Sequence, residues 1–311
     1  MASPPASPSP AVPASAEALE KALARTYIAD PRTALAAWLA LQLGRPLLLE
    51  GPAGVGKTDL ARALAETLGR PLVRLQCYEG LDEAKALYEW DYAKQMLATQ
   101  LLREETRGAA DPGERLAGAT AAFFDRRFLI PRPLLQALES PVPAVLLLDE
   151  VDRADPEFEA FLLEILAEQQ VTIPELGTIR AAHPPLVLLT TNATRDMTDA
   201  LRRRCLHAFL DYPPPSREIA ILELRVPGVA RALAERLVAF VHEVRKLDLR
   251  KAPSISETLD WARALLLLGA SALDKPLVES TLGALVKHEE DRVKVAALAS
   301  RTLVPEQRNR S

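Results

Sequence analysis

The chain has 311 residues, of which 49% are hydrophobic and 26% are charged, and its formal net charge is −4. The length allows one large and one smaller domain with a sizeable core. The acidic balance argues against broad nonspecific binding to nucleic acid, no apolar run approaches the length of a membrane span, and Cys77 and Cys205 have no metal or redox spacing. We therefore expect a cytoplasmic protein with reduced thiols, no membrane span and no nucleic-acid partner.

Residues 1–17 are rich in proline, alanine and serine and lack the basic start and apolar segment of a secretory signal. We expect a disordered tail there. Helical periodicity then predicts helices from about Ser15 to Ala29 and from Pro31 to Leu43.

A glycine-rich segment follows the first predicted strand, Pro46 to Glu50, and precedes a predicted helix, Asp59 to Leu68. It fits the phosphate-loop pattern G-x-x-x-x-G-K-[ST], in which backbone N–H groups surround phosphate oxygens. Lys57 would supply a charge to the phosphates, and the Thr58 hydroxyl would ligate Mg²⁺. The predicted nucleotide-binding residues are Gly51, Pro52, Ala53, Gly54, Val55, Gly56, Lys57, Thr58 and Asp59.

Residues Pro71 to Gln76 are predicted as the second strand, and Leu81 to Arg107 as largely helical. An aromatic cluster begins just before the second of these segments and continues into it, and the sequence leaves its role open. It could be a packing face or subunit contact, or a surface that grips a client protein. The cluster comprises Tyr78, Tyr88, Trp90 and Tyr92.

An apolar run from Ala144 to Leu148 predicts a strand buried on both faces, and two acids follow it directly. Strand ends in α/β sheets open on the ligand crevice. At such a position Asp149 would hold Mg²⁺, and Glu150 would orient and deprotonate the attacking water.

A small hairpin is predicted from Val171 to Ala181, and the fourth core strand from Leu186 to Thr191. Asn192, at the end of this strand, could hydrogen-bond the γ-phosphate or the lytic water. It could instead form an Asx turn that caps the next helix.

Three arginines, Arg202, Arg203 and Arg204, precede a fifth predicted strand, Leu206 to Asp211. They could complement the dipole of a helix end, or supply an arginine finger to the γ-phosphate of a neighbouring subunit. Everything after Pro213 is predicted to be helical. The expected domains are therefore an α/β nucleotide-binding domain at residues 18–212 and an all-helical domain at residues 213–311.

The order of these motifs resembles that of AAA+ ATPases. Asp149 to Ala154, followed by a leucine-rich helix, resembles the MoxR family, as does the hairpin before the fourth strand. Residues Tyr88 to Tyr92 and Pro253 to Trp261 are similar to the CoxD-type branch, which is tied to maturation of molybdenum-containing carbon monoxide dehydrogenase and related hydroxylases. The resemblance covers residues 18–300 and implies an AAA+ P-loop αβα sandwich with a five-stranded parallel sheet and a helical lid.

The resemblance also implies an ATP-hydrolysing remodelling chaperone that forms a ring, usually a hexamer, with ATP and Mg²⁺ at the subunit interfaces. On this basis Lys57 and Thr58 bind the phosphates and Mg²⁺. The expected partners are the other subunits, a client metalloenzyme and a von Willebrand A-type adaptor protein. The remaining assignments are Asp149 for the metal, Glu150 for activation of water, Asn192 as the first sensor, and Arg204, or else Arg203, as the finger.

One departure from the family pattern is found in the lid. Many AAA+ lids carry an arginine that contacts the γ-phosphate, but the matching stretch here, Ser254 to Glu257, has none. We therefore expect weak nucleotide sensing by the lid, with slow or partner-coupled turnover. Two other functions stay open: a nucleic-acid motor or loader, and a nucleotide-gated binding module that seldom hydrolyses.

Overall fold

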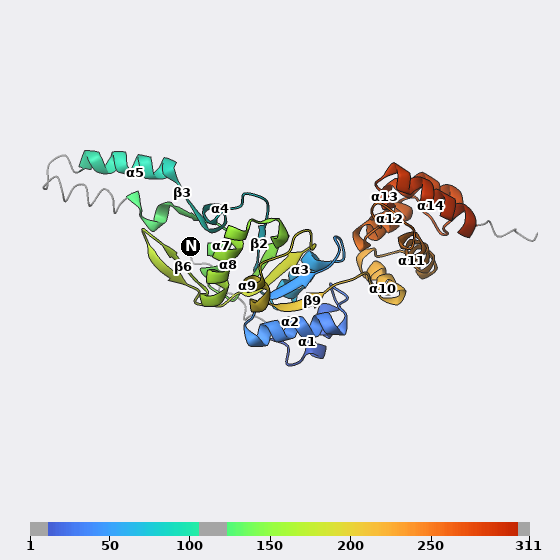
Figure 1. The fold of residues 1–311 in the computed structure, drawn as a ribbon, viewed down its shortest axis with the longest axis horizontal. Helices are drawn as coiled ribbons and strands as arrows, with labels where there is room; N and C mark the ends of the chain where they lie inside the picture. Colours follow the sequence, from blue (N-terminus) through green and yellow to red (C-terminus); the bar gives the residue numbers. More distant parts are fainter. Residues whose placement is uncertain (1–11, 106–122, 304–311) are drawn as a thin grey trace, which may run out of the picture. The chain divides into compact units, whose positions relative to one another are not determined.

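The computed structural model describes residues 12–105 and 123–303 (Figure 1). Residues 1–11, most of the expected disordered tail, lie outside the described part of the chain. The first helix, α1 (Ala16–Leu23), begins two residues before the expected domain boundary at residue 18. Its start is fixed by Ser15, whose side chain accepts a hydrogen bond from the backbone N–H of Ala18.

The described chain forms two compact units, and each is described here by itself. The first unit consists of residues 12–13, 36–49, 64–105 and 123–208. The second consists of residues 14–35, 50–63 and 209–303. The glycine-rich segment thus groups with the C-terminal helices, whereas the expected division at residue 212 separates them.

The first unit is built on a five-stranded sheet with the order β2-β5-β8-β1-β9. Its pairs β2–β5 and β5–β8 are parallel, with Gln76 opposite Asp149 and Val145 opposite Leu186. The strands are β1 (Leu47–Glu50), β2 (Leu72–Gln76), β5 (Val145–Asp149), β8 (Leu186–Thr191) and β9 (Leu206–Phe209). The expected α/β fold with five parallel strands is confirmed, because the apolar runs of the sequence become strands with both faces covered.

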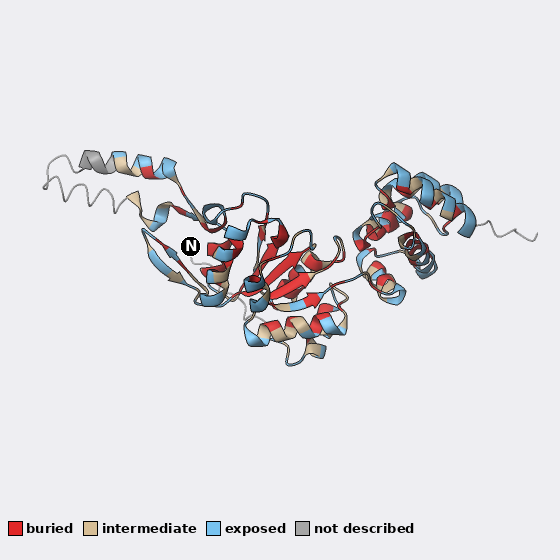
Figure 2. Cartoon of the chain, viewed as in Figure 1, coloured by how far each residue is buried: buried red, intermediate tan, exposed pale blue. Residues whose placement is uncertain are grey.

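The hydrophobic core lies around the central strands, whose residues are buried along their whole length (Figure 2). Helix α7 (Pro133–Leu138) packs against β2 and β5. Helix α8 (Pro156–Glu168) contributes Phe158, Leu162 and Ile165 to the same core. The connections of this unit also include η2 (Val151–Arg153), the hairpin β6 (Gln170–Ile173) and β7 (Gly177–Arg180), and α9 (Asp199–Arg204).

The prediction of a largely helical segment from Leu81 to Arg107 is wrong in its centre. The structure has a short helix, a strand and a second helix there, and the strand pairs antiparallel with a distant segment. Trp90 explains the difference, because its ring packs edge-on against Phe124, with the ring centroids 5.5 Å apart. The elements are α4 (Glu83–Leu87), β3 (Tyr88–Trp90), α5 (Tyr92–Glu105), η1 (Arg126–Phe128) and β4 (Leu129–Pro131).

The second unit is helical beyond β9, and its described residues contain no strand after that point. Trp261 is completely buried; its ring lies 5.7 Å from that of Phe240, and its Nε1 donates to Thr281 Oγ1 at 2.8 Å. The helices are α10 (Pro215–Arg225), α11 (Arg231–Arg245), α12 (Ile255–Leu267), α13 (Lys275–Leu285) and α14 (Glu289–Thr302). Two further helices, α2 (Pro31–Leu43) and α3 (Lys57–Thr67), begin in the second unit and end in the first. Within the described ranges, no helix is long and apolar enough to cross a bilayer.

Both thiols should be chemically inert in the folded protein. Cys77 and Cys205 are buried, and burial raises the pKa of each thiol to about 12. We expect neither to react with Ellman's reagent within minutes at pH 8, because the thiolate is the reactive form, whereas the denatured chain should release two equivalents. Rapid native-state reaction of either thiol would contradict the burial described here.

Candidate active site

The glycine-rich loop leaves the carboxyl end of β1 and ends at the first turn of α3. Gly51 has φ +151°, and a Cβ atom there would lie 1.9 Å from the carbonyl oxygen of Leu210. Lys57 is 7% exposed, and its Nζ donates to the carbonyl oxygens of Gly51 and Pro52 at 2.5 and 2.7 Å. The ammonium group is therefore held inside the curve of the loop, as a phosphate-binding role requires.

The lid segment that lacks the expected arginine contacts this loop. Gly54 has φ +76°, and a Cβ atom there would lie 2.2 Å from Ser254 Oγ. Ser254 caps α12 in a capping box with Glu257. Burial raises the pKa of Glu257, but the side-chain and backbone hydrogen bonds with Ser254 and nearby Lys251 outweigh it and lower the pKa. The cap fixes the helix start against the loop.

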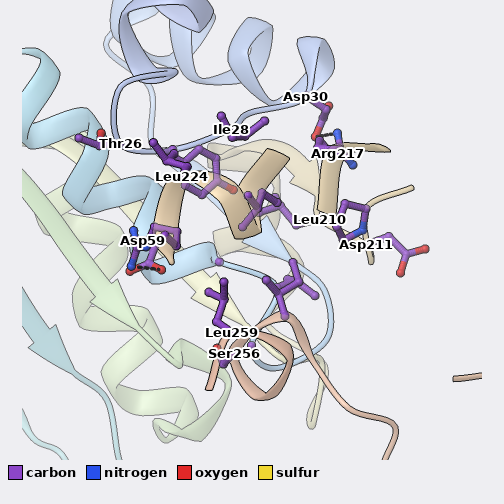
Figure 3. A pocket seen from close by; sticks show the side chains of 18 residues that line it. Thr26, Ile28, Asp30, Asp59, Leu210, Asp211, Arg217, Leu224, Ser256 and Leu259 are labelled. Carbon is purple, nitrogen blue, oxygen red and sulfur yellow. Dashed lines mark hydrogen bonds and ion pairs between the residues drawn. The ribbon is translucent and has the colours of Figure 1, made fainter. Parts of the chain in front are cut away.

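A pocket adjoins the loop within the second unit (Figure 3). Two ion pairs border it: Arg217 with Asp30 at 3.4 Å, and Arg225 with Asp59 at 3.4 Å. Burial and the nearby Asp30 raise the pKa of Tyr27 above its usual range, so its hydroxyl stays protonated. The apolar part of the lining comes from several elements, with Ile28, Leu210, Ile221, Leu224, Ile255 and Leu259.

The sequence analysis missed this pocket. Its lining comes from a short connection before α2, from the segment after β9 and from α10 and α12. Of these, only residues 253–261 resemble a family motif, and that resemblance does not point to a pocket. The predicted residues Gly54, Val55, Gly56 and Asp59 are the part of the lining that the pattern could identify.

Two acids, Asp149 and Glu150, stand at the end of β5 in the first unit. Asp149 is 4% exposed; its Oδ1 accepts from Thr190 Oγ1 at 2.5 Å, and its Oδ2 accepts from Arg74. Glu150 has φ +55°, a left-handed conformation that costs a non-glycine residue roughly 1–2 kcal/mol. Its backbone N–H donates to the same Thr190 hydroxyl at 2.8 Å. Strain of this kind gathers at functional sites, where the surrounding contacts maintain it.

The segment after β8 carries Asn192 and is held by two buried acids. Asp152 Oδ2 accepts from the backbone N–H and the hydroxyl of Thr194, at 3.0 and 2.6 Å. Glu159, on α8, accepts from Arg195 and from the backbone N–H of Thr198. Burial raises the pKa of Asp152, but the hydrogen bonds from Thr194 and from the backbone of Asn192 outweigh it and lower the pKa.

A turn spans Thr191 to Ala193, and the side chain that accepts its hydrogen bond is that of Thr191, one residue before Asn192. Thr191 Oγ1 accepts from the backbone N–H of Ala193 at 2.9 Å, and Ala193 has φ +56°. A hydroxyl can replace the carboxamide in such turns. The sensor role of Asn192 stays a prediction.

No set of three or more His, Cys, Asp or Glu side chains that could hold a metal gathers anywhere in residues 12–105 or 123–303.

The AAA domain model of the dynein-related subfamily matches residues 46–205, about half of the chain. The chain belongs to this family. The expected enzyme class, an ATPase, is confirmed, and the matched segment spans the glycine-rich loop, both acids of β5, Asn192 and the arginines of α9.

Relatives of this AAA ATPase include proteins with assigned roles. The gas vesicle ATPase GvpN of Ancylobacter aquaticus is 27% identical, over 76% of this chain and 65% of GvpN. The denitrification regulatory protein NirQ of Stutzerimonas stutzeri is 25% identical, over 70% of each protein. A RuvB mutant of Thermotoga maritima aligns with a TM-score of 0.48 and 19% identity, over 86% of this chain and 70% of that structure. The chain thus spans just under two thirds of the length of GvpN.

The arginine cluster of this AAA ATPase forms the last turn of α9. Arg203 and Arg204 are exposed, and Arg202 is half-buried. Arg45 donates to the carbonyl oxygens of Arg203 and Arg204, at 2.8 and 3.2 Å, and so closes the helix end. The three side chains lie at the negative end of the helix, as the dipole interpretation expects. The finger role stays a prediction.

The aromatic cluster divides between core and surface. Trp90 is 8% exposed, whereas Tyr78 and Tyr92 are 43% and 63% exposed. Together with Tyr88 they line a hollow bordered by the Arg132–Glu89 ion pair. The buried ring supports the packing interpretation, and the exposed ones keep the client-binding interpretation open.

Gly54 allows a direct test of the contact between loop and lid. Gly80 has nearly the same φ, +78° against +76°, but no atom lies within 4 Å of the Cβ position there. We expect Gly54→Ala to cost about 1–3 kcal/mol more in free energy of unfolding than Gly80→Ala, because only the first methyl meets Ser254. Ser254→Gly should recover part of the loss. Equal destabilisation by the two alanines in thermal unfolding would contradict the contact.

Proposed function

We propose that this AAA ATPase is a remodelling chaperone that uses ATP hydrolysis to change the conformation of a client protein. One observation carries the chemistry. A loop that encloses the Lys57 ammonium is joined to β1, and the buried strand β5 of the same sheet ends in two acids. Since β1, β8 and β5 are consecutive in the sheet, we place their functional residues at the carboxyl ends of these strands.

ATP and Mg²⁺ fit the residues present. The glycines at positions 51, 54 and 56 carry no side chain that would keep phosphate oxygens away from the loop backbone. We assign phosphate binding to the loop N–H groups and Lys57, and metal binding to Thr58 and Asp149, which offer the oxygen ligands that Mg²⁺ prefers. When bound, Mg²⁺ would supply positive charge beside the phosphate oxygens.

The remaining roles fall on side chains near the strand ends. Glu150 would accept a proton from the attacking water, and its half-exposed carboxylate is accessible for this. Asn192 would orient that water or the γ-phosphate through its carboxamide. Arg204, or else Arg203, would be the finger that enters the site of a neighbouring subunit. Since a finger acts on another subunit's site, this assignment requires an oligomer, and the resemblance to AAA+ proteins favours a hexameric ring.

The client is inferred from motifs alone. The DEVDRA stretch, the β6–β7 hairpin and the resemblance of residues 88–92 and 253–261 favour a MoxR-type protein of the CoxD-like branch. We propose a molybdenum hydroxylase, such as a carbon monoxide dehydrogenase, as the client, with a von Willebrand A-type protein as adaptor. Maturation of a metalloenzyme needs a conformational opening that nucleotide turnover can drive.

Mixing two inactive variants tests the shared site. We expect Glu150→Gln and Arg204→Ala each to lose at least about 100-fold in ATPase rate, because one removes the base and the other a charge on the γ-phosphate. A mixture of the two variants should regain part of the rate, since some interfaces then combine an intact Glu150 with an intact Arg204. The measurement is phosphate release at fixed total protein.

Two exposed residues provide controls: Glu164→Gln on α8 and Arg236→Ala on α11 should keep the wild-type rate. If Arg204→Ala is active but Arg203→Ala is not, the finger is Arg203. If Glu150→Gln keeps full turnover, the catalytic assignment is wrong.

Co-expression tests the client. A molybdenum hydroxylase from the same organism should gain cofactor-loaded enzyme several-fold when expressed with the wild-type chain, and should gain none with Glu150→Gln. Loading can be measured by the metal content of the purified hydroxylase. Equal loading with and without the wild-type chain would exclude this client while leaving the ATPase assignment untouched.

A further inference from the structure

The buried carboxylate at the end of β5 is neutralised by an arginine from the adjacent strand. Arg74, in β2, donates from Nε and Nη2 to Oδ2 of Asp149, at 3.1 and 2.5 Å. The Asp149 side chain is 5% exposed, whereas that of Arg74 is 43% exposed. Thr190 donates to the other oxygen, Oδ1. Each carboxylate oxygen thus accepts a hydrogen bond, and one of them faces a full positive charge.

The same arginine is connected to Glu150 through one intermediate side chain. Arg74 Nη2 donates to Gln76 Oε1 at 2.6 Å, and Gln76 Nε2 donates to Glu150 Oε2 at 3.1 Å. Residues 74 and 76 lie on one face of β2, because side chains alternate along a strand. Since Oε1 of Gln76 accepts from Arg74, its amide N–H₂ is directed at Glu150. Arg74 therefore contacts one of the two acids directly and the other through Gln76.

We propose that Arg74 is a positioning residue that competes with the divalent metal for Oδ2 of Asp149. This inference rests on the proposed function, in which Asp149 is a metal ligand. A guanidinium and a divalent cation repel each other strongly at one carboxylate oxygen, so binding of the metal would drive Arg74 away.

The exposure of the two partners favours an exchange of cations. A buried carboxylate needs a compensating charge at all times, and Asp149 is too buried to rely on water. Arg74 reaches solvent with almost half of its side chain, so its guanidinium can be hydrated after it leaves. Its departure would also remove the partner of Gln76 Oε1, while Glu150 Oε2 would keep its ion pair with Arg153 Nη1, at 3.2 Å.

A purely structural ion pair makes the opposite prediction for metal binding. If Arg74 only orients Asp149, its removal should weaken metal binding, because the carboxylate loses its support. If Arg74 competes with the metal, its removal should strengthen binding. The sign of the change in metal affinity therefore separates the two roles without any measurement of turnover.

The probe is Mn²⁺, titrated by electron paramagnetic resonance into the full chain with a slowly hydrolysed ATP analogue. We expect Arg74→Gln to tighten Mn²⁺ binding by about five-fold, the size of a partly exposed ion pair. Arg74→Lys retains the competing charge and should stay near the wild-type affinity. Asp149→Asn should weaken binding at least about ten-fold, and adding Arg74→Gln to it should give no tightening.

Thermal unfolding provides a second measurement on the same variants. Arg74→Gln should unfold at a lower temperature than wild type, because the buried carboxylate of Asp149 loses its ion pair with Arg74, and Mn²⁺ with the analogue should raise its Tm more than it raises that of wild type. If Arg74→Gln fails to fold, Arg74→Lys carries the test, because a lysine cannot make both hydrogen bonds of the guanidinium to Oδ2, and weaker Mn²⁺ binding in it than in wild type would overturn the proposal.

The outcomes distinguish the two proposals. If Asp149→Asn weakens Mn²⁺ binding but Arg74→Gln leaves it unchanged or weaker, competition by Arg74 is wrong and the metal role of Asp149 stands. If Asp149→Asn leaves Mn²⁺ binding unchanged, the metal role itself is wrong, and the role of Arg74 falls with it.

Discussion

A strand that is buried on both faces can place charge only at its ends, and this constraint organises the first unit. All five residues of β5 and all six of β8 are buried. Asp149 ends β5 as a carboxylate in apolar surroundings, where an unpaired charge would cost several kcal/mol. The parallel register places Gln76 of β2 opposite it, so Arg74 and Thr190 can approach from the strands on either side. The pairing of β2 with β5 thus extends the sheet and also brings Arg74 within hydrogen-bond distance of Asp149.

Close packing constrains the glycine-rich loop in a different way. Its glycines meet later parts of the chain, the carbonyl of Leu210 at Gly51 and the hydroxyl of Ser254 at Gly54. In a phosphate loop, glycine is expected because phosphate oxygens approach the backbone closely. Here there is a second reason, because a side chain at Gly51 or Gly54 would collide with atoms of Leu210 or Ser254. The capping box at Ser254 therefore does two things: it starts α12, and it sets how far α12 stands from the loop.

The sequence predicts the sheet well because its strands are long apolar runs that end in polar residues, a pattern that survives in any context. It fails at β3, where the pairing of Tyr88–Trp90 with Leu129–Pro131 spans about forty residues of chain and local periodicity carries no trace of it. It also identifies Asp149 and Glu150 as a pair of acids at the end of a strand but gives no hint of Arg74, since a single arginine in a strand has many possible partners. The pocket beside Tyr27 is missed because its lining comes from segments that lie far apart in the sequence.

Two left-handed residues, Glu150 and Ala193, follow neighbouring strands, and a strained backbone persists only where other contacts outweigh its cost. The Thr190 hydroxyl accepts a hydrogen bond from the backbone N–H of Glu150. After Ala193, the buried acids Asp152 and Glu159 accept hydrogen bonds from the backbone of the following residues. Asp152 is a residue of η2 and Glu159 a residue of α8, so the segment from Asn192 to α9 is held by the elements that follow β5. The start of α9 is therefore tied by hydrogen bonds to the two elements that come directly after Glu150, and α9 ends in the exposed side chains of Arg203 and Arg204.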